Sequence, residues 1–236
     1  RILIDKKVIV SIHHVVPEKF DKSNLRNFVS RDKFVDQYHV PCQKTKDFIS
    51  RITEKPIEVV GYCYNSDIWY PSDKAKARDF LEISPDAYVV GSFQRDTEGT
   101  DLFIETLKKI EKDNLFVLLG GWRRQYVINR LEEEGIGYKF IEMAPLELLR
   151  EMYAACDLYV VASRVEGGPQ AILESAAMKI PIISRDVGMA SAVLNENCIV
   201  DVPEDMYYPV NEDLEICYNN VKAYEMHNLV EDYVEL

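Results

Sequence analysis

The sequence lacks several features that would assign it to a common class of protein. No apolar run approaches the ~20 residues needed to cross a membrane, and we recognise no signal-peptide pattern. Basic residues are in the minority, with 28 Lys and Arg against 40 Asp and Glu. The resulting net charge of −12 argues against nucleic-acid binding and against a polybasic membrane surface. We therefore expect a soluble cytoplasmic protein with no transmembrane segment, whose full-length form would at most lie peripheral to the membrane.

Cysteine and histidine are scarce, and neither shows a metal-binding spacing. The cysteines are odd in number, form no Cys-x-x-Cys pair and in several cases stand in apolar surroundings, which favours buried free thiols. They are Cys42, Cys63, Cys156, Cys198 and Cys217. The four histidines show no ligand spacing either. We expect a reducing compartment and no metal site.

Two catalytic patterns are also missing. Ser163 does not lie in a nucleophile-elbow sequence, which disfavours serine hydrolysis. The glycines between Gly91 and Gly99 do not have the spacing of a dinucleotide fingerprint, which argues against NAD binding.

What the sequence does contain is enough apolar residues, 47% of the chain, for a packed core. From residue 87 onward, short apolar runs alternate with helical patterns. The expected strands are 88–93, 115–119, 138–141, 158–162, 180–184 and 198–200, and the expected helices are 101–112, 123–134, 146–155, 169–179, 189–194 and one long helix over 211–230. Such alternation predicts a parallel sheet with helices on both faces, whose ligands bind beyond the carboxyl ends of the strands.

The first 71 residues are less regular. Strands are expected at 7–12, 37–40 and 57–60 and a helix at 43–51, whereas residues 17–30 form a polar, irregular stretch. Residues 61–73 form an aromatic connection without periodicity, which is the best domain boundary in the chain. This connection contains Tyr62, Tyr64 and Trp69, for which packing is the favoured role and acceptor contact the alternative.

Residues 164–183 combine a glycine turn, a helix and a strand. Pro169 suits the first helical position, where a missing N–H costs nothing, and Gln170 and Glu174 share a helical face because they are four residues apart. Unpaired amides at a helix start attract an anion, whereas Glu166 and Glu174 suit sugar hydroxyls better than phosphate. We interpret the stretch as a site for a phosphate-linked sugar. The alternative is a turn carboxylate beside an ordinary exposed helical glutamate.

Residues 166–174 read Glu-Gly-Gly-Pro-Gln-Ala-Ile-Leu-Glu, and the next nine residues read Ser-Ala-Ala-Met-Lys-Ile-Pro-Ile-Ile. This pattern resembles the signature of retaining nucleotide-sugar glycosyltransferases of family 4. The resemblance extends over 89–194 and more weakly to His13. It implies an α/β fold of the GT-B type, with a Rossmann-like parallel sheet covered by helices on both faces and a partial second Rossmann-like domain. The implied domains are 1–71, a remnant of the acceptor-side domain with the linker; 72–210, the nucleotide-sugar-binding domain; and 211–236, a helix that can cross back to the first domain.

The resemblance also implies roles for individual residues. Glu166 would contact the donor sugar, Glu174 would accept hydrogen bonds from the ribose, and the turn amides would meet the sugar and diphosphate. A strand ending in His13 would present this histidine to the sugar, the alternative being a structural histidine. The implied catalytic set is Glu166, Arg95 and His13, and the implied donor-binding set is Gly91, Ser92, Gly99, Arg123, Arg124, Gly167, Gly168, Gln170 and Glu174.

The chain departs from the family pattern at two loops. Ser92 and Glu98 stand where the family usually has an arginine and a lysine, although a departing diphosphate needs positive charge. We expect Arg95, with one of Arg123 and Arg124 pointing inward, to supply it; solvated side chains are the alternative. Pro169 follows two glycines where the family usually has Gly-aromatic-Gly, so one amide donor is absent.

From the resemblance we expect transfer of a sugar from a nucleoside-diphosphate donor to an acceptor hydroxyl, with retention of anomeric configuration and without a cofactor. UDP and GDP are the favoured donor nucleotides, and the acceptor is a glycan, a lipid or a small molecule. The alternatives are a non-catalytic nucleotide-sugar-binding module, motivated by Ser92 and Glu98, and a GT-B sugar-nucleotide epimerase.

Overall fold

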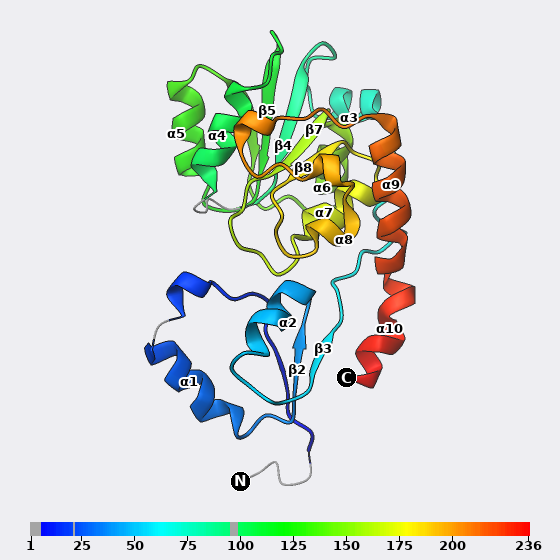
Figure 1. Cartoon of the computed structure of the whole chain (residues 1–236). Helices are drawn as coiled ribbons and strands as arrows, with labels where there is room; N and C mark the ends of the chain where they lie inside the picture. The colour runs from blue at the N-terminus through cyan, green and yellow to red at the C-terminus, as the bar shows by residue number, and fades with distance from the viewer. Residues whose placement is uncertain (1–5, 21, 95–98) are drawn as a thin grey trace.

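A computed structural model describes residues 6–20, 22–94 and 99–236. Figure 1 shows two α/β parts joined by a linker and by the C-terminal helices. A three-stranded parallel sheet of order β1-β2-β3 forms the first part, and a five-stranded parallel sheet of order β6-β5-β4-β7-β8 forms the second. The strands are β1 Ile9–Ser11, β2 Gln37–Val40, β3 Ile57–Val59, β4 Tyr88–Ser92, β5 Leu115–Gly120, β6 Gly137–Ile141, β7 Leu158–Val161 and β8 Ile182–Ser184.

The helices of the described chain lie around these sheets. The α-helices are α1 Lys22–Asp32, α2 Gln43–Ile49, α3 Lys74–Phe80, α4 Thr100–Lys108, α5 Gln125–Glu133, α6 Leu146–Ala155, α7 Gln170–Ala177, α8 Ala190–Val193, α9 Asn211–Val221 and α10 Met226–Glu235. Short 3₁₀ turns are η1 Pro17–Lys19, η2 Glu196–Cys198, η3 Pro203–Asp205 and η4 Lys222–Tyr224. No described helix is long and apolar enough to cross a membrane.

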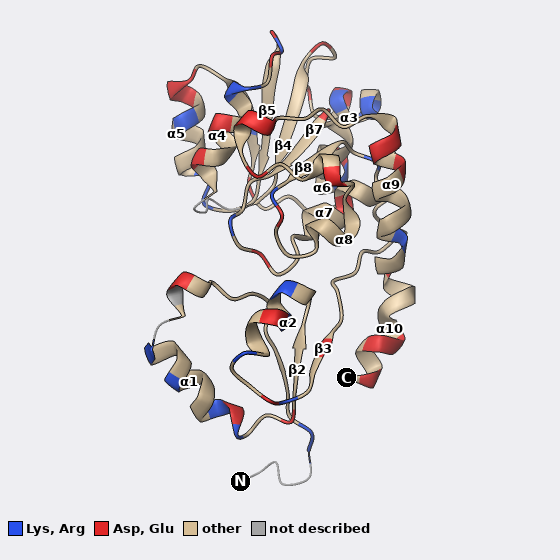
Figure 2. Cartoon of the chain, in the orientation of Figure 1, with Lys and Arg blue, Asp and Glu red and all other residues tan. Residues whose placement is uncertain are grey.

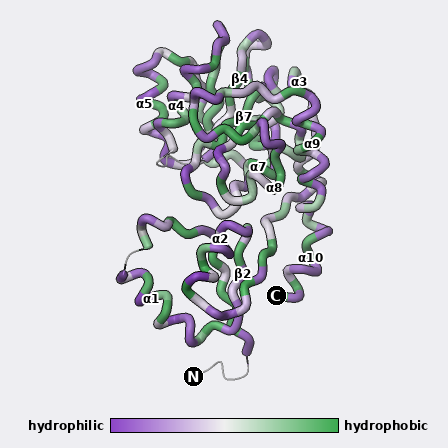
Figure 3. The backbone as a smooth tube through the Cα atoms, viewed as in Figure 1, coloured by the Kyte–Doolittle hydropathy of each residue, from purple (hydrophilic) through white to green (hydrophobic). Residues whose placement is uncertain are grey.

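Both faces of the larger sheet are covered because its strands alternate their side chains between two cores. Val89 and Leu118 pack with α3, α6, α7, α8 and α9, whereas Val90 and Val117 pack with α4 and α5 on the other face. In Figure 3 the residues of β7 are coloured as hydrophobic, whereas the outer helices carry more hydrophilic residues. Figure 2 shows acidic residues to be prominent on α9 and α10. A few charged residues are nevertheless buried, namely Arg78, Arg124, Glu174 and Asp213.

Three expectations about secondary structure are wrong, and one helix, α3, was not predicted. Residues 198–200 form no strand: Asn195 accepts a hydrogen bond from the Asn197 amide, the chain turns through η2, and a single bridge joins Ile199 to Ser184. The irregular stretch at 17–30 contains most of α1, which has no fully buried residue and therefore gives little apolar periodicity. Helix α3 was not expected; the Asp73 carboxylate caps it by accepting two amide hydrogen bonds.

The expected long helix over 211–230 is divided into α9 and α10. The chain turns through η4, and Glu225 has an extended backbone while its carboxylate accepts the His227 amide, which starts a new helix. No Gly or Pro marks this break in the sequence. The break places α10 beside the first part (Figure 1), where the Tyr233 hydroxyl donates to the Gly61 carbonyl at 2.9 Å and the Tyr233 ring contacts His39 at 5.6 Å.

The linker between the two parts is packed rather than loose. Tyr64 and Trp69 are buried, and the Tyr64 backbone exchanges hydrogen bonds with Tyr224 and Met226 at 3.0 and 2.9 Å. This result favours packing over acceptor contact for these two aromatic residues. The third, Tyr62, is half-buried and belongs to the site described next.

Candidate functional site

The candidate site lies at the carboxyl edge of the larger sheet, between the loops that follow β4 and β7. The strand order changes direction between these two strands, and such switch points form ligand crevices in open α/β sheets. The start of α4 is pressed onto this edge: a Cβ atom on Gly99 would lie 2.0 Å from the Ala162 carbonyl oxygen. Only glycine permits this close approach. The start of α4 and the end of β7 are therefore in contact at the edge of the sheet where a ligand would bind.

The Glu166 turn reaches from this edge to the first part of the chain. A Cβ atom on Gly167 would lie 1.5 Å from the His13 carbonyl oxygen, so the turn contacts the segment just after β1. The His13 ring is exposed, and its Nδ1 lies 2.6 Å from the Tyr62 hydroxyl. The structure thus brings together Glu166, Gly167 and His13, which are about 150 residues apart in sequence.

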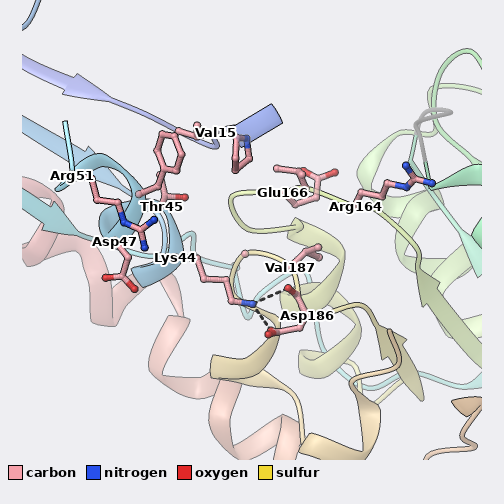
Figure 4. Close-up of a pocket in the computed structure, with 13 residues that line it drawn as sticks. Val15, Lys44, Thr45, Asp47, Arg51, Arg164, Glu166, Asp186 and Val187 are labelled. Carbon is pink, nitrogen blue, oxygen red and sulfur yellow. Dashed lines mark hydrogen bonds and ion pairs between the residues drawn. The ribbon is translucent and has the colours of Figure 1, made fainter. Parts of the chain in front are cut away.

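A cleft of about 380 Å³ opens beside this contact. One wall comes from the first part, mainly from Lys44 and Asp47 of α2 and from Arg51, which follows this helix. The other wall comes from residues 164–166 and 186–188 of the second part (Figure 4). Lys44 Nζ bridges the cleft, at 2.5 Å from Asp186 Oδ1 and 2.7 Å from the Asp186 carbonyl oxygen. This partly exposed ion pair lowers the pKa of Asp186.

Glu174 lies on α7 with only 8% of its surface exposed. The Tyr153 hydroxyl donates a hydrogen bond to its Oε2 at 2.7 Å. Burial disfavours the charged carboxylate and raises its pKa from 4.5 to about 7, although the Tyr153 hydrogen bond acts in the opposite direction. A carboxylate kept in an apolar core at this cost is typical of a functional group rather than of an exposed helical glutamate.

The paired arginines after β5 differ in orientation, as expected. Arg124 is 3% exposed; its Nη2 donates to Ser92 Oγ at 3.1 Å, and its Nη1 donates to the Gln94 carbonyl oxygen. Arg123 is exposed and stacks its guanidinium on the Trp122 ring at 4.0 Å. The buried arginine therefore ties the end of β5 to the end of β4.

The remaining predicted residues divide into three groups. Gly91 and Ser92 are buried at the end of β4, and Gly168 is buried in the Glu166 turn. Gln170 is exposed and donates to the Cys63 carbonyl oxygen at 2.6 Å, so it holds α7 to the linker rather than facing the cleft. Arg95 and Glu98 lie outside the described residues.

The prediction missed five charged cleft residues, which are Lys44, Asp47, Arg51, Arg164 and Asp186. Arg164 could have been found from its position two residues before Glu166. Lys44 and Asp186 carry no motif, because their pairing depends on a contact across 142 residues. Among the described residues, no cluster of three or more His, Cys, Asp or Glu could hold a metal ion.

A larger hollow of about 520 Å³ lies wholly within the first part, between α1 and the small sheet. Its lining is mostly apolar and includes Phe20, Phe28 and Tyr38. It contains none of the predicted site residues, so the cleft beside Glu166 is the better candidate site.

Comparisons with known proteins identify relatives of this architecture. A family model described as Glycosyl transferases group 1 matches residues 84–211. The chain is 27% identical over 158 residues to the alpha-galactosylglucosyldiacylglycerol synthase of Streptococcus pneumoniae, covering 60% of the chain and 42% of that protein. It is 26% identical over 135 residues to the lipopolysaccharide core biosynthesis mannosyltransferase LpsB of Rhizobium meliloti, covering 52% and 38%. The chain spans about two fifths of the length of these curated relatives.

Solved structures match nearly the whole chain. Anabaena Alr3699/HepE, solved in complex with UDP and glucose, superposes with a TM-score of 0.82 at 16% identity, covering 98% of this chain and 71% of that one. The sucrose-phosphate synthase of Thermosynechococcus elongatus gives 0.79 at 17% identity, covering 96% and 66%. These likenesses confirm the α/β architecture of the GT-B type that the sequence predicts.

Proposed function

The chain belongs to the family Glycosyl transferases group 1, and from this premise we propose that it transfers a sugar from a nucleoside-diphosphate donor to an acceptor hydroxyl, with retention of anomeric configuration. The observation that carries the proposal is the position of the Glu166 turn at the switch point of the sheet, where it contacts His13 of the first part beside a cleft lined by both parts. We also propose membership of family 4 and a cytoplasmic location.

The donor would lie across the carboxyl edge of the larger sheet. In this arrangement Glu166 orients the sugar by accepting hydrogen bonds from its hydroxyls, and Glu174 accepts from the ribose. Both roles need the ionised carboxylate, so the raised pKa of Glu174 makes donor binding favour pH values above about 7. We favour UDP over GDP, because HepE, the structural neighbour with a TM-score of 0.81, was solved with UDP-glucose.

In the reaction, the bond between the anomeric carbon and the diphosphate oxygen breaks, and its electron pair leaves on that oxygen. The acceptor oxygen forms its bond to the same face of the anomeric carbon, and its proton passes to the departing diphosphate. The products are a glycoside and a protonated nucleoside diphosphate. Residues 1–71 would belong to the acceptor side and residues 72–210 to the donor side, with His13 facing the sugar from the acceptor side.

A specific observation favours a second candidate, a module that binds the nucleotide sugar without transferring it. Ser92 occupies the place where the resemblance predicts an arginine, and it is buried against Arg124. Donor binding without product formation would support this candidate over the enzyme.

Thermal unfolding with UDP, GDP, ADP and NAD tests the proposal. A ligand at a hundredfold excess over its Kd stabilises the native state by about 2.7 kcal/mol. For a chain of this size, that free energy raises Tm by roughly 5–10 °C. We expect a shift with one nucleoside diphosphate that is lost in Glu174→Ala and retained in Glu147→Ala, a matched change at an exposed glutamate of α6. No shift with any nucleotide would contradict the proposal.

A further inference from the structure

The proposed reaction needs positive charge on a departing diphosphate, and the arginines predicted for this task differ in their availability. Arg124 is buried, and its guanidinium donates to two loop oxygens at the end of β4. Arg123 lies over the Trp122 ring. Arg95 lies outside the described residues. A buried arginine that binds loop oxygens shapes the site, but an accessible cation is still required to contact the ligand.

Arg164 meets this requirement. It is exposed, it follows the end of β7, and it lines the cleft two residues before Glu166. Its side chain makes no hydrogen bond or ion pair with another described residue, whereas Lys44 in the same cleft is neutralised by Asp186. Figure 4 shows the Arg164 side chain beyond Glu166, extending away from the Lys44–Asp186 pair.

A carboxylate and an accessible guanidinium therefore come from one short loop at the switch point. A sugar joined to a diphosphate carries the complementary groups, hydroxyl donors at one end and anionic oxygens at the other. The planar guanidinium can donate two parallel hydrogen bonds to phosphate oxygens. Because the chain carries a net charge of −12, such a local cation is needed to hold an anion at this edge.

We propose that Arg164 is the residue that binds the donor diphosphate and stabilises it as the leaving group. The inference rests on the proposed function. When the bond to the anomeric carbon breaks and its electron pair passes to the diphosphate oxygen, the Arg164 guanidinium donates hydrogen bonds to the non-bridging oxygens. The proton that this diphosphate receives comes from the acceptor hydroxyl, so Arg164 remains a cation throughout.

The test uses calorimetry to compare the affinities of the wild-type chain and Arg164→Gln for UDP, UMP and uridine. If GDP is the nucleotide that binds, GDP, GMP and guanosine replace these ligands. A contact with the distal phosphate strengthens UDP binding but not uridine binding. We expect Arg164→Gln to reduce the preference for UDP over UMP by about tenfold or more. Arg164→Lys should retain part of this preference, because it keeps the charge but loses the paired donors.

Two further variants separate this contact from other sources of charge. Arg51→Gln removes a cation from the opposite wall of the cleft, so an equal loss there would show a long-range field and overturn the inference. A loss of UDP preference in Arg95→Gln but not in Arg164→Gln would assign the role to Arg95 and would also overturn it. The Tm of each variant without ligand checks that it folds.

The outcomes distinguish the inference from the proposed function. If the wild-type chain binds none of the nucleotides, both are wrong. If it prefers UDP to UMP and Arg164→Gln retains that preference, the assignment of Arg164 is wrong while the proposed function stands.

Discussion

Ionisation of Glu174 should cost this protein much of its stability above neutral pH. The carboxyl lies in the core below the candidate site, and burial raises its pKa from 4.5 to about 7 in the folded state. The native state therefore binds more protons than the unfolded state between these two pH values. A group of this kind stabilises the fold fully below pH 4.5, and its contribution is lost as the pH rises through 7.

The magnitude follows from the same two values. Each pKa unit corresponds to about 1.4 kcal/mol, so the free energy of unfolding falls by about 3 kcal/mol over this window. Glu174→Gln removes the titration while leaving an oxygen that can accept the Tyr153 hydroxyl. We expect the stability of the variant relative to wild type to increase by about 3 kcal/mol between pH 4.5 and pH 8.

Urea denaturation of both proteins at half-unit pH intervals measures this difference, because the titrations that they share cancel. A difference in unfolding free energy that is constant over the whole range would refute the reasoning.

The gain in stability of Glu174→Gln at pH 8 should accompany loss of nucleotide binding, since the amide cannot replace the carboxylate as a double acceptor for ribose hydroxyls. Retention of full nucleotide affinity would remove Glu174 from the proposed site.

Three further predictions concern the same region. Tyr153→Phe removes the hydrogen bond that lowers the pKa of Glu174, so the pH at which stability is lost should move upward; an unchanged pH–stability curve would contradict this. Gly167→Ala places a methyl group against the His13 carbonyl oxygen and should lower the free energy of unfolding, measured by urea denaturation, by about 1–3 kcal/mol. The same variant should show faster proteolysis of the linker at 61–73. An unchanged rate of cleavage would mean that the contact between the two parts is unimportant. Glu166→Ala should lower turnover about a hundredfold or more with an unchanged Tm, and near-wild-type turnover would exclude this residue as the sugar-orienting group.

The secondary structure of the larger sheet was predictable because its signals are local. Buried parallel strands appear as short apolar runs, and covering helices show a 3.6-residue period, so the ranges of β4 to β8 agree with expectation to within about two residues. Helix α1 and the break between α9 and α10 escaped prediction. Helix α1 has no fully buried residue and therefore shows little apolar periodicity. The break between α9 and α10 is made by the Glu225 side-chain cap, without a Gly or Pro to mark it in the sequence.

The site was predictable in part for the same reason. The strand, glycine turn and helix at 158–177 occur within twenty residues, so the sequence by itself determined that Glu166 lies at the carboxyl edge of a parallel sheet and that Glu174 follows on the next helix. It also determined that a cation had to be found for an anionic ligand, since acidic residues exceed basic ones.

Only the tertiary structure decided which side chains are available and in what state. Arg124 is buried and Arg164 accessible because the loops after β4, β5 and β7 pack together, although these residues lie in separate segments of the sequence. Lys44 is neutralised by Asp186 across the cleft, and the core around Glu174 raises its pKa. Charge, burial and protonation depend on neighbours brought from distant parts of the chain, and the local pattern of a sequence does not specify those neighbours.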